Sequence, residues 1–283
     1  MAQASSLIDF LNGPGPVASL RLSRVRGSSP RTAGTEMFVR KDALWGTIGG
    51  GQLEHMAIDA ARDLLASGNI SRHLDIPLGP EIGQCCGGRV ELEINRMSRA
   101  SIETAIDDAQ VRDSELPVVH ILGSGHVGRE LANLFQHLPV RTILIDQRQE
   151  ELDLCGATVE KRLSVIPEFE IFNAPAGSAF IVLTHDHGLD FLLASAALQR
   201  GDAAYVGLIG SATKRAKFAS WARKHCDGLS VAPLICPIGA GGSRDKRPAV
   251  IAALVAAEVI SALTSETTAY HPCEGAVSHI AAQ

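Results

Sequence analysis

The pattern of apolar and polar residues predicts a mixture of strands and helices in the first third of the chain. Short apolar or alternating runs predict strands over residues 17–25, 36–41, 44–48, 71–78 and 89–96. Helical spacing predicts helices over residues 52–66 and 99–115, the second of them highly charged and therefore expected at the surface. We therefore expect a small mixed α/β domain over residues 1–115, with its boundary near residues 115–117.

From residue 116 onward, apolar runs alternate regularly with helical patterns. Strands are predicted at residues 118–122, 140–146, 179–184 and 204–209, and helices at 127–137, 189–200, 213–225 and 246–263. An alternation of this kind is typical of a parallel sheet with helices on both faces. The predicted fold class is α/β, with a C-terminal Rossmann-like, doubly wound parallel sheet over residues 116–283 and a smaller mixed α/β domain before it.

Composition and charge narrow the class of protein further. A chain of 283 residues suits two domains, at roughly 150 residues per domain. The net charge of −5 argues against a general nucleic-acid binder, which needs a basic face. Residues 1–10 lack a signal-peptide pattern, and the apolar run 249–257 stops at Glu258, too short for a membrane span. We expect a cytoplasmic protein without a membrane partner, whose six cysteines are reduced.

A glycine-rich turn of the form G-x-G-x-x-G follows the first strand of the predicted Rossmann-like domain. Its candidate nucleotide-binding residues are Gly123, Gly125, His126 and Gly128, which precede a helix whose N-terminus would face a phosphate. Asp146 ends the next strand, where it could accept a hydrogen bond from a ribose hydroxyl of an adenine nucleotide or NAD(P). The alternative is a Rossmann-type turn that has lost its nucleotide.

A second glycine-rich turn lies in the first domain, between a predicted strand and a predicted helix. Gly49, Gly50 and Gly51 are consecutive there, and consecutive glycines usually mark a turn or a close approach to a ligand. Their N–H groups could form a nest for a phosphate or another anion. The alternative is a tight connection, with Glu54 stabilising the first turn of the helix.

Two adjacent cysteines, Cys85 and Cys86, follow Gln84 and precede two glycines. The chain contains no Cys-x-x-Cys, and adjacent thiols do not easily close an unstrained disulfide. Thiolates bind soft metals or carry sulfur as persulfides, so we expect this pair to be functional. The alternative is a buried structural pair. Arg31, in a loop nearer the start, could add a contact to an anion or lie in a solvated loop.

Other polar clusters leave two interpretations open. His185, Asp186 and His187 end a predicted strand and could serve acid–base chemistry or a metal, or could cap the following helix. With the glycine loop at 123–128 they support an alternative function, an NAD(P)-dependent oxidoreductase. A third possibility is a nucleotide-responsive scaffold. Basic residues such as Lys214 and Arg215 could complete an anion site or lie exposed at the start of a helix.

Taken together, these segments resemble the XdhC/CoxI family, the xanthine dehydrogenase accessory proteins. The stretches that carry the resemblance are Ser29-Pro30-Arg31 with Gly34 and Met37, residues 46–54 (GTIGGGQLE), 84–88 (QCCGG), 123–128 (GSGHVG), 207–211 (GLIGS), 236–239 (CPIG) and 246–258 (KRPAVIAALVAAE). The likeness covers nearly the whole chain. The segment 46–54 and the QCCGG segment are specific, whereas the Rossmann turn is not.

The resemblance implies a function that composition could not give. Proteins of this family bind the molybdenum cofactor, hold it during sulfuration and insert it into xanthine dehydrogenase or a related molybdenum hydroxylase. The implied partners are the apo-dehydrogenase and a cysteine desulfurase; a homodimer is also possible. The implied role is that of an accessory factor rather than an enzyme. Residues expected at the cofactor are Arg31, Gly49, Gly50, Gly51, Glu54, Gln84, Cys85 and Cys86, with the two cysteines near molybdenum.

Overall fold

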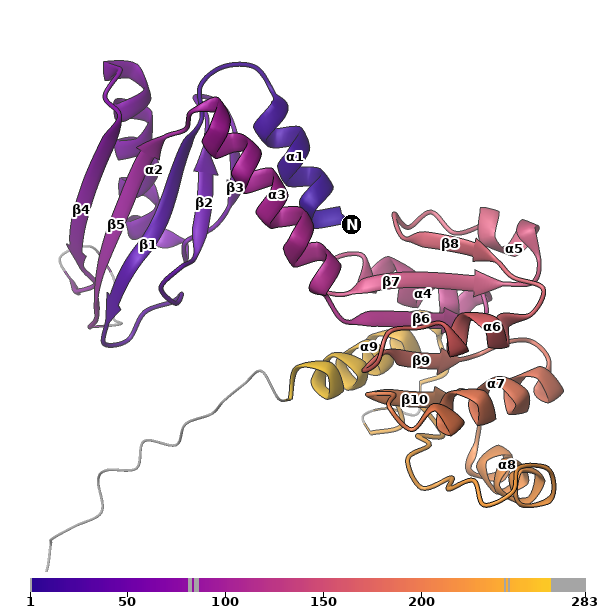
Figure 1. Cartoon of the computed structure of the whole chain (residues 1–283). Helices are drawn as coiled ribbons and strands as arrows, with labels where there is room; N and C mark the ends of the chain where they lie inside the picture. Colours follow the sequence, from indigo (N-terminus) through magenta and orange to yellow (C-terminus); the bar gives the residue numbers. More distant parts are fainter. Residues whose placement is uncertain (1, 81–82, 84–86, 242, 244, 266–283) are drawn as a thin grey trace, which may run out of the picture. The chain divides into compact units, whose positions relative to one another are not determined.

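The computed structural model describes residues 2–80, 83, 87–241, 243 and 245–265 (Figure 1). The candidate residues Gln84, Cys85 and Cys86 lie outside the described residues. The chain divides into two compact units, Gln3–Ser114, here called the N-terminal unit, and Glu115–Gln283, here called the Rossmann unit.

The N-terminal unit is built on an antiparallel five-stranded sheet. Its elements are α1 (Ala2–Asn12), β1 (Ala18–Arg26), β2 (Glu36–Val39), β3 (Leu44–Gly46), α2 (Gly51–Ser67), β4 (Ser71–Pro77), β5 (Arg89–Arg96) and α3 (Arg99–Glu115). The strand order is β3-β2-β1-β5-β4, with every neighbouring pair antiparallel. The ends of β1, β3 and β4 therefore lie at the same edge of the sheet as the starts of β2 and β5. We call this edge the loop edge.

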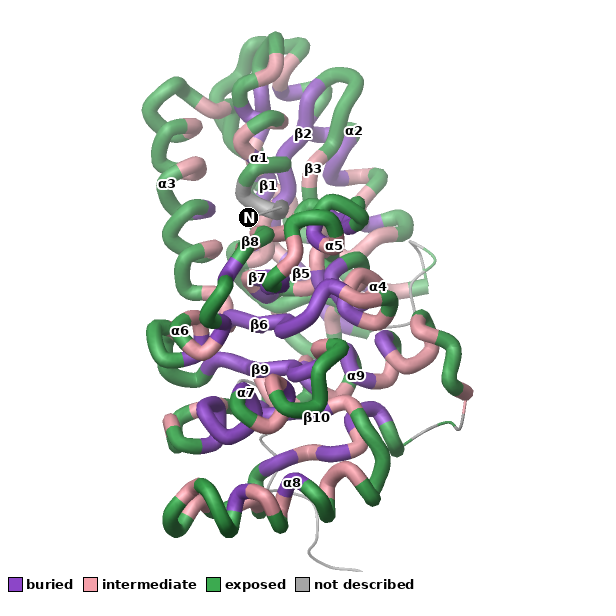
Figure 2. Tube along the Cα trace, turned by 90° about the vertical axis from the view of Figure 1, so that its right-hand side faces the viewer, coloured by how far each residue is buried: buried purple, intermediate pink, exposed green. Residues whose placement is uncertain are grey.

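Helices cover parts of both faces of this sheet. The α2 helix packs its buried Leu53 and Leu64 against Leu20 and Leu92 of the central strands. On the other face, α1 and α3 pack against a smaller cluster that includes Phe38. Most of α3 is exposed, as predicted for a charged surface helix (Figure 2).

The sequence pattern did not predict helix α1, although the structure anchors its C-terminal end firmly. The buried Arg40 guanidinium donates hydrogen bonds to the carbonyl oxygens of Phe10 and Leu11, at 3.0 Å each. Carbonyl groups in the last turn of a helix have no partner within that helix. Arg40, which directly follows β2, supplies that partner, an interaction that periodicity alone could not indicate.

The Rossmann unit alternates strands and helices around a parallel sheet. Its elements are β6 (Val118–Leu122), α4 (His126–Phe135), β7 (Arg141–Asp146), α5 (Gln149–Asp153), β8 (Glu160–Leu163), α6 (Pro167–Phe172), β9 (Ala179–Val182), α7 (His187–Arg200), β10 (Tyr205–Leu208), α8 (Ala212–His225) and α9 (Pro248–Thr264). The strand order is β10-β9-β6-β7-β8, and all neighbours are parallel. The predicted doubly wound parallel sheet is confirmed, although α5, β8 and α6 were not predicted.

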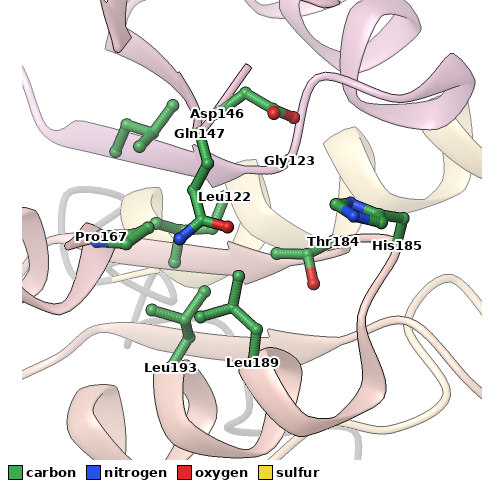
Figure 3. Close-up of a pocket in the computed structure, with 10 residues that line it drawn as sticks. Leu122, Gly123, Asp146, Gln147, Pro167, Thr184, His185, Leu189 and Leu193 are labelled. Atoms are coloured by element: carbon green, nitrogen blue, oxygen red, sulfur yellow. The ribbon is translucent and has the colours of Figure 1, made fainter. Parts of the chain in front are cut away.

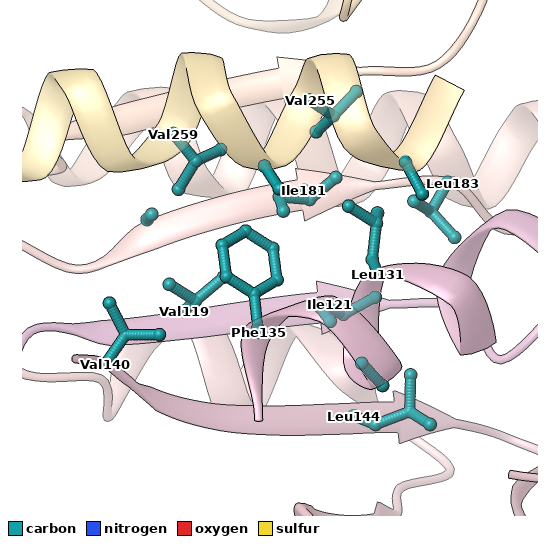
Figure 4. Close-up of a cluster of buried hydrophobic side chains, with 14 of the residues drawn as sticks. Val119, Ile121, Leu131, Phe135, Val140, Leu144, Ile181, Leu183, Val255 and Val259 are labelled. Carbon is teal, nitrogen blue, oxygen red and sulfur yellow. The ribbon is translucent and has the colours of Figure 1, made fainter. Parts of the chain in front are cut away.

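Two apolar cores sandwich this parallel sheet. One core joins the sheet to α4 and α9, where Phe135 packs with Val119, Ile181 and Val259 (Figure 4). The other joins the opposite face to α7 and α8, through residues such as Phe218. Every residue of β6 is buried, as expected for a strand covered on both faces.

The strand order reverses between β6 and β9, because the chain moves outward to β7 and β8 before it returns to β9 and β10. In open parallel sheets, ligands bind outside the carboxyl ends of the strands at such a reversal. Among the helices of the described residues, none is long and apolar enough to cross a membrane.

Candidate functional site

The glycine turn of the N-terminal unit connects β3 to α2 and is closed by a carboxylate from that helix. Glu54 Oε2 accepts hydrogen bonds from Thr47 Oγ1 at 2.5 Å, Ile48 N at 3.1 Å and Gly50 N at 3.2 Å. The N–H of Gly49 donates to Thr47 Oγ1 at 3.1 Å. The turn therefore already holds an anion, and that anion belongs to the protein itself.

Hydrogen bonding favours the charged form of this carboxylate. Burial raises the pKa of Glu54, but the hydrogen bonds from Thr47, Gly50 and Ile48 outweigh it and lower the pKa below its usual range. This corrects our expectation that the N–H groups of Gly49 and Gly50 are free to hold a phosphate. Within the first helical turn, the N–H groups that begin at Gly51 keep no partner inside the helix.

Three loops of the N-terminal unit converge at the loop edge. A Cβ built at Gly49 would lie 3.0 Å from the side chain of Pro30 and 3.7 Å from Arg31 Cγ. A Cβ built at Gly88 would lie 2.1 Å from the Ser28 carbonyl oxygen. The loop after β1 thus contacts both the glycine turn and the glycine that ends the β4–β5 connection.

The cysteine pair belongs to that β4–β5 connection. Its described C-terminal flank is fixed by two backbone hydrogen bonds, Gly87 N to Leu78 O at 2.9 Å and Leu78 N to Gly88 O at 2.8 Å. Gly87 follows Cys86 directly in the chain. The described flank of the QCCGG segment therefore lies against the same loop that carries Arg31.

Arg31 is an exposed cation of this region. Arg26 pairs with Glu91 at 2.6 Å and Arg89 pairs with Asp75 at 2.6 Å. Arg31 has no such ion pair among the described residues. As far as the described residues show, the region can therefore offer an anionic ligand the guanidinium of Arg31 and the start of α2.

The glycine loop of the Rossmann unit joins β6 to α4, as predicted. Two of its three glycines are required by packing. A Cβ at Gly123, whose φ is +124°, would lie 2.6 Å from the Leu183 carbonyl oxygen, and one at Gly128 would lie 2.0 Å from the Gly123 carbonyl oxygen. A Cβ at Gly125 would meet nothing within 4 Å, and its φ of −69° suits any residue. The fold itself therefore gives no reason for glycine at position 125.

Asp146 ties this loop to the end of β7. Its Oδ2 accepts a hydrogen bond from Ser124 N at 2.7 Å, and its Oδ1 accepts one from Arg148 N at 3.0 Å. The carboxylate is almost fully buried. Asp146 thus has a structural role in shaping the loop, and its expected contact with a ribose hydroxyl stays a prediction.

A cleft lies at the switch point between the glycine loop and the end of β9 (Figure 3). Gly123, Asp146 and Gln147 line one side, and Thr184 and His185 come from the end of β9. Leu189 and Leu193 of α7 form an apolar floor. This is the position at which doubly wound sheets bind their ligands, but the cleft itself has a volume of only about 10 Å³.

The two histidines of the Thr-His-Asp-His segment do not act as a pair. His185 lines the switch-point cleft, whereas His187 lines a separate cleft farther along the sheet. Asp186 Oδ1 accepts hydrogen bonds from Gly188 N at 2.6 Å and Leu189 N at 3.2 Å, so it caps α7. In the described part of the chain, no group of three or more His, Cys, Asp or Glu side chains could hold a metal ion.

Glu258 has a structural role that the sequence reasoning missed. Its carboxylate accepts hydrogen bonds from Tyr205 Oη at 3.1 Å and Gly239 N at 2.8 Å. These contacts join α9 to β10 and to the Cys-Pro-Ile-Gly segment. The only sequence signal was a single glutamate in an otherwise apolar helix, which suggests a paired carboxylate but does not identify its partners.

The fold and its two glycine-rich turns define a two-unit α/β protein whose second unit is of the Rossmann type. Residues 119–259 match the XdhC Rossmann domain, and residues 11–75 match the XdhC and CoxI family. The chain belongs to the XdhC and CoxI family. A comparison with curated proteins gives no match.

A solved structure with a similar fold is a xanthine dehydrogenase from Bacillus halodurans. The two chains are 15% identical, with a TM-score of 0.78, and the alignment covers 96% of this chain and 98% of the other. At this identity the likeness concerns the fold alone.

Proposed function

We propose that this protein is an accessory factor that binds the molybdenum cofactor, holds it during sulfuration and inserts it into xanthine dehydrogenase or a related molybdenum hydroxylase. Membership of the XdhC and CoxI family is the observation that carries the proposal. The convergence of the three family-like loops at one edge of the N-terminal sheet supports it, because a ligand there could contact all three.

The residues at the loop edge fit the chemistry of this cargo. The cofactor presents a phosphate, a polar pterin and a soft molybdenum–dithiolene centre. Arg31 and the first N–H groups of α2 would hold the phosphate, since guanidinium groups and helix N-termini both favour anions. Cys85 and Cys86 would contact the molybdenum or carry the incoming sulfur. Glu54 would act through the turn, by keeping Ile48 and Gly50 in place.

Cofactor retention tests this proposal. Full-length protein purified from a molybdenum-replete host should carry oxidisable pterin near stoichiometrically. The Cys85→Ser/Cys86→Ser variant should lose cofactor or fail to become sulfurated. Cys226→Ser is the matched control, because Cys226 is a free thiol on a different segment. Unchanged retention and sulfuration in the double variant would remove the cysteine pair from the mechanism.

The proposed partners are the apo-dehydrogenase and a cysteine desulfurase. A transfer assay would supply cofactor-loaded protein to the apo-dehydrogenase and measure its activity, with the desulfurase and cysteine present or omitted. We expect the apo-dehydrogenase to become active only when the cofactor-loaded protein and the desulfurase are both present. Equal activation by free cofactor alone would argue against the insertion role.

A nucleotide site at the glycine loop is the second candidate function. Gly125 supports it, because the packing of the protein does not require a glycine at this position. A pyrophosphate lying against the loop would need the space that a side chain there would fill. Calorimetry with ADP, ATP and NAD tests binding. The oxidoreductase alternative also requires a change at the nicotinamide absorbance band with small alcohols or acids. Nucleotide binding without such a change would favour the interpretation that the protein is a nucleotide-responsive scaffold.

A further inference from the structure

A second cleft lies in the Rossmann unit, at the carboxyl ends of β9 and β10. Its volume is about 530 Å³, within the range that small-molecule sites occupy. The walls come from His187 and Phe191 of α7, Ile209 after β10, and Lys214 and Lys217 of α8. Its lining differs from that of the switch-point cleft, with which it shares Thr184.

The charge of this cleft is positive. Lys217 is exposed and has no ion pair among the described residues, and no acidic side chain belongs to the lining. Lys214 is held in place by an ion pair of 2.5 Å with Asp190, which is fully buried. Asp190 is fixed in turn by Thr184, whose hydroxyl donates to it at 2.7 Å. The two lysines therefore differ, since Lys214 is already neutralised and Lys217 is free to bind an anion.

The loop before α8 shapes the lysine end of the cleft. A Cβ at Gly210 would lie 2.6 Å from Lys214 Cδ, so glycine is what lets the lysine stem cross the backbone there. Ser211 Oγ accepts a hydrogen bond from Lys214 N at 3.3 Å and caps the helix. The N–H groups of Ala212 and Thr213, in the first turn of α8, have no partner within the helix.

Another part of the lining is apolar and aromatic. The ring of Phe191 lies 5.4 Å from that of Phe218 and 5.8 Å from that of Trp221, measured between centroids. These contacts hold Phe191 as a fixed surface next to Ile209. A cleft whose lining combines a free lysine with a fixed aromatic ring suits a ligand that carries both a phosphate and a planar ring.

We propose that this cleft binds a mononucleotide-sized phosphate ester of an aromatic heterocycle. The phosphate lies against Lys217 and the start of α8, and the heterocycle packs on Phe191. This cleft is formed by residues of the Rossmann unit, whereas the proposed cofactor site is formed by residues of the N-terminal unit. The cleft is also separate from the glycine loop, so failure of either proposed function leaves this inference to be judged alone.

Calorimetric titration of the full-length protein with AMP tests the site. Lys217→Glu should weaken AMP binding by about tenfold or more, since it replaces a charge-assisted contact with repulsion. Lys224→Glu, an exposed lysine of the same helix outside the cleft, carries the same charge change and should bind AMP like the wild type. Adenosine, which lacks the phosphate, should bind about tenfold more weakly than AMP.

Tryptophan emission gives a second measurement that locates the ligand. The chain has two tryptophans, so a Trp45→Phe variant leaves Trp221 as the reporter beside Phe191. AMP should change its emission, and the change should disappear in Lys217→Glu at the same ligand concentration. The inference is overturned if AMP does not bind, if adenosine binds equally well, or if both lysine variants bind AMP alike. Loss of AMP binding in Gly125→Ala but not in Lys217→Glu would instead assign AMP to the glycine loop.

Discussion

The two glycine-rich turns of this protein follow the same outline, a strand, a glycine run and a helix, yet they use their N–H groups differently. In the N-terminal unit, Glu54 returns from the helix and its carboxylate fills the turn. In the Rossmann unit, Asp146 bonds the backbone of Ser124 at the edge of the loop and leaves the space around Gly125 open. A glycine-rich turn of this kind therefore indicates that an anion is bound there. It does not indicate whether that anion is a side chain of the protein or part of a ligand.

The largest effect should come from Gly128→Ala. Its Cβ would collide with the backbone oxygen of Gly123, which cannot move without displacing the loop. We expect a loss of about 3 kcal/mol or more in the free energy of unfolding, or failure to fold. Urea denaturation followed by circular dichroism measures it. A loss below about 1 kcal/mol would show that the loop relaxes easily and would contradict its tight packing around Gly128.

Gly49→Ala should have the next largest effect. Gly49 has a φ of +129°, which an alanine adopts only with strain, and a Cβ would press on Pro30. We expect a loss of about 2 kcal/mol in the free energy of unfolding. Gly79→Ala is the control, because a Cβ there would meet nothing within 4 Å and its φ is not positive. Equal stability of the two variants would contradict the strained turn.

Glu54→Gln should destabilise the protein by about 1 kcal/mol at neutral pH, because an amide is a weaker acceptor than a carboxylate. The pKa of Glu54 in the folded protein lies below its usual value. The carboxylate therefore contributes fully to the free energy of unfolding at pH values above the pKa of the unfolded chain, and this contribution is lost as the pH falls through the pKa of the folded protein. The stability difference between wild type and variant should therefore shrink toward acidic pH. Parallel denaturation curves at neutral and acidic pH check this, and a constant difference would count against a resident anion.

Gly125→Ala should have the smallest effect on folding, no more than about 1 kcal/mol, because its backbone conformation is ordinary and the added Cβ has room. Its effect on ligand binding should be much larger. We expect ADP to bind about tenfold more weakly, since the methyl group fills the space of the pyrophosphate. An unchanged ADP affinity would show that the open space does not serve a nucleotide.

Much of the fold could be predicted because the apolar pattern was regular where the elements are buried. Strands β6, β7 and β9 lie in a double-sided core, and their apolar runs identified them. The region 147–178 was left without elements because α5, β8 and α6 are short, and β8 alternates half-buried and exposed residues at the edge of the sheet. β6, β7 and β9 are equally short, but nearly all of their residues are buried, whereas α5, β8 and α6 bury at most two residues each and therefore show neither an apolar run nor a period.

The candidate sites were less predictable than the fold. The sequence located both glycine turns, but it could not show that Glu54 occupies one of them, because its three acceptor contacts depend on how the turn folds back. Nor could it separate His185 from His187, which are two residues apart and line different clefts. The pairing of Lys214 with the buried Asp190 joins two helices and left no local signal.

The most direct test of the proposed function compares the two units by cofactor content. Pterin and molybdenum per chain would be measured in full-length wild type, Arg31→Glu and Lys217→Glu, each isolated from a molybdenum-replete host. Both substitutions replace an exposed positively charged side chain by a negatively charged one, at the loop edge in the first case and in the Rossmann unit in the second. We predict near-stoichiometric cofactor in the wild type and in Lys217→Glu, and a marked loss in Arg31→Glu. Wild-type protein without cofactor, or loss only in Lys217→Glu, would contradict a cofactor site at the loop edge.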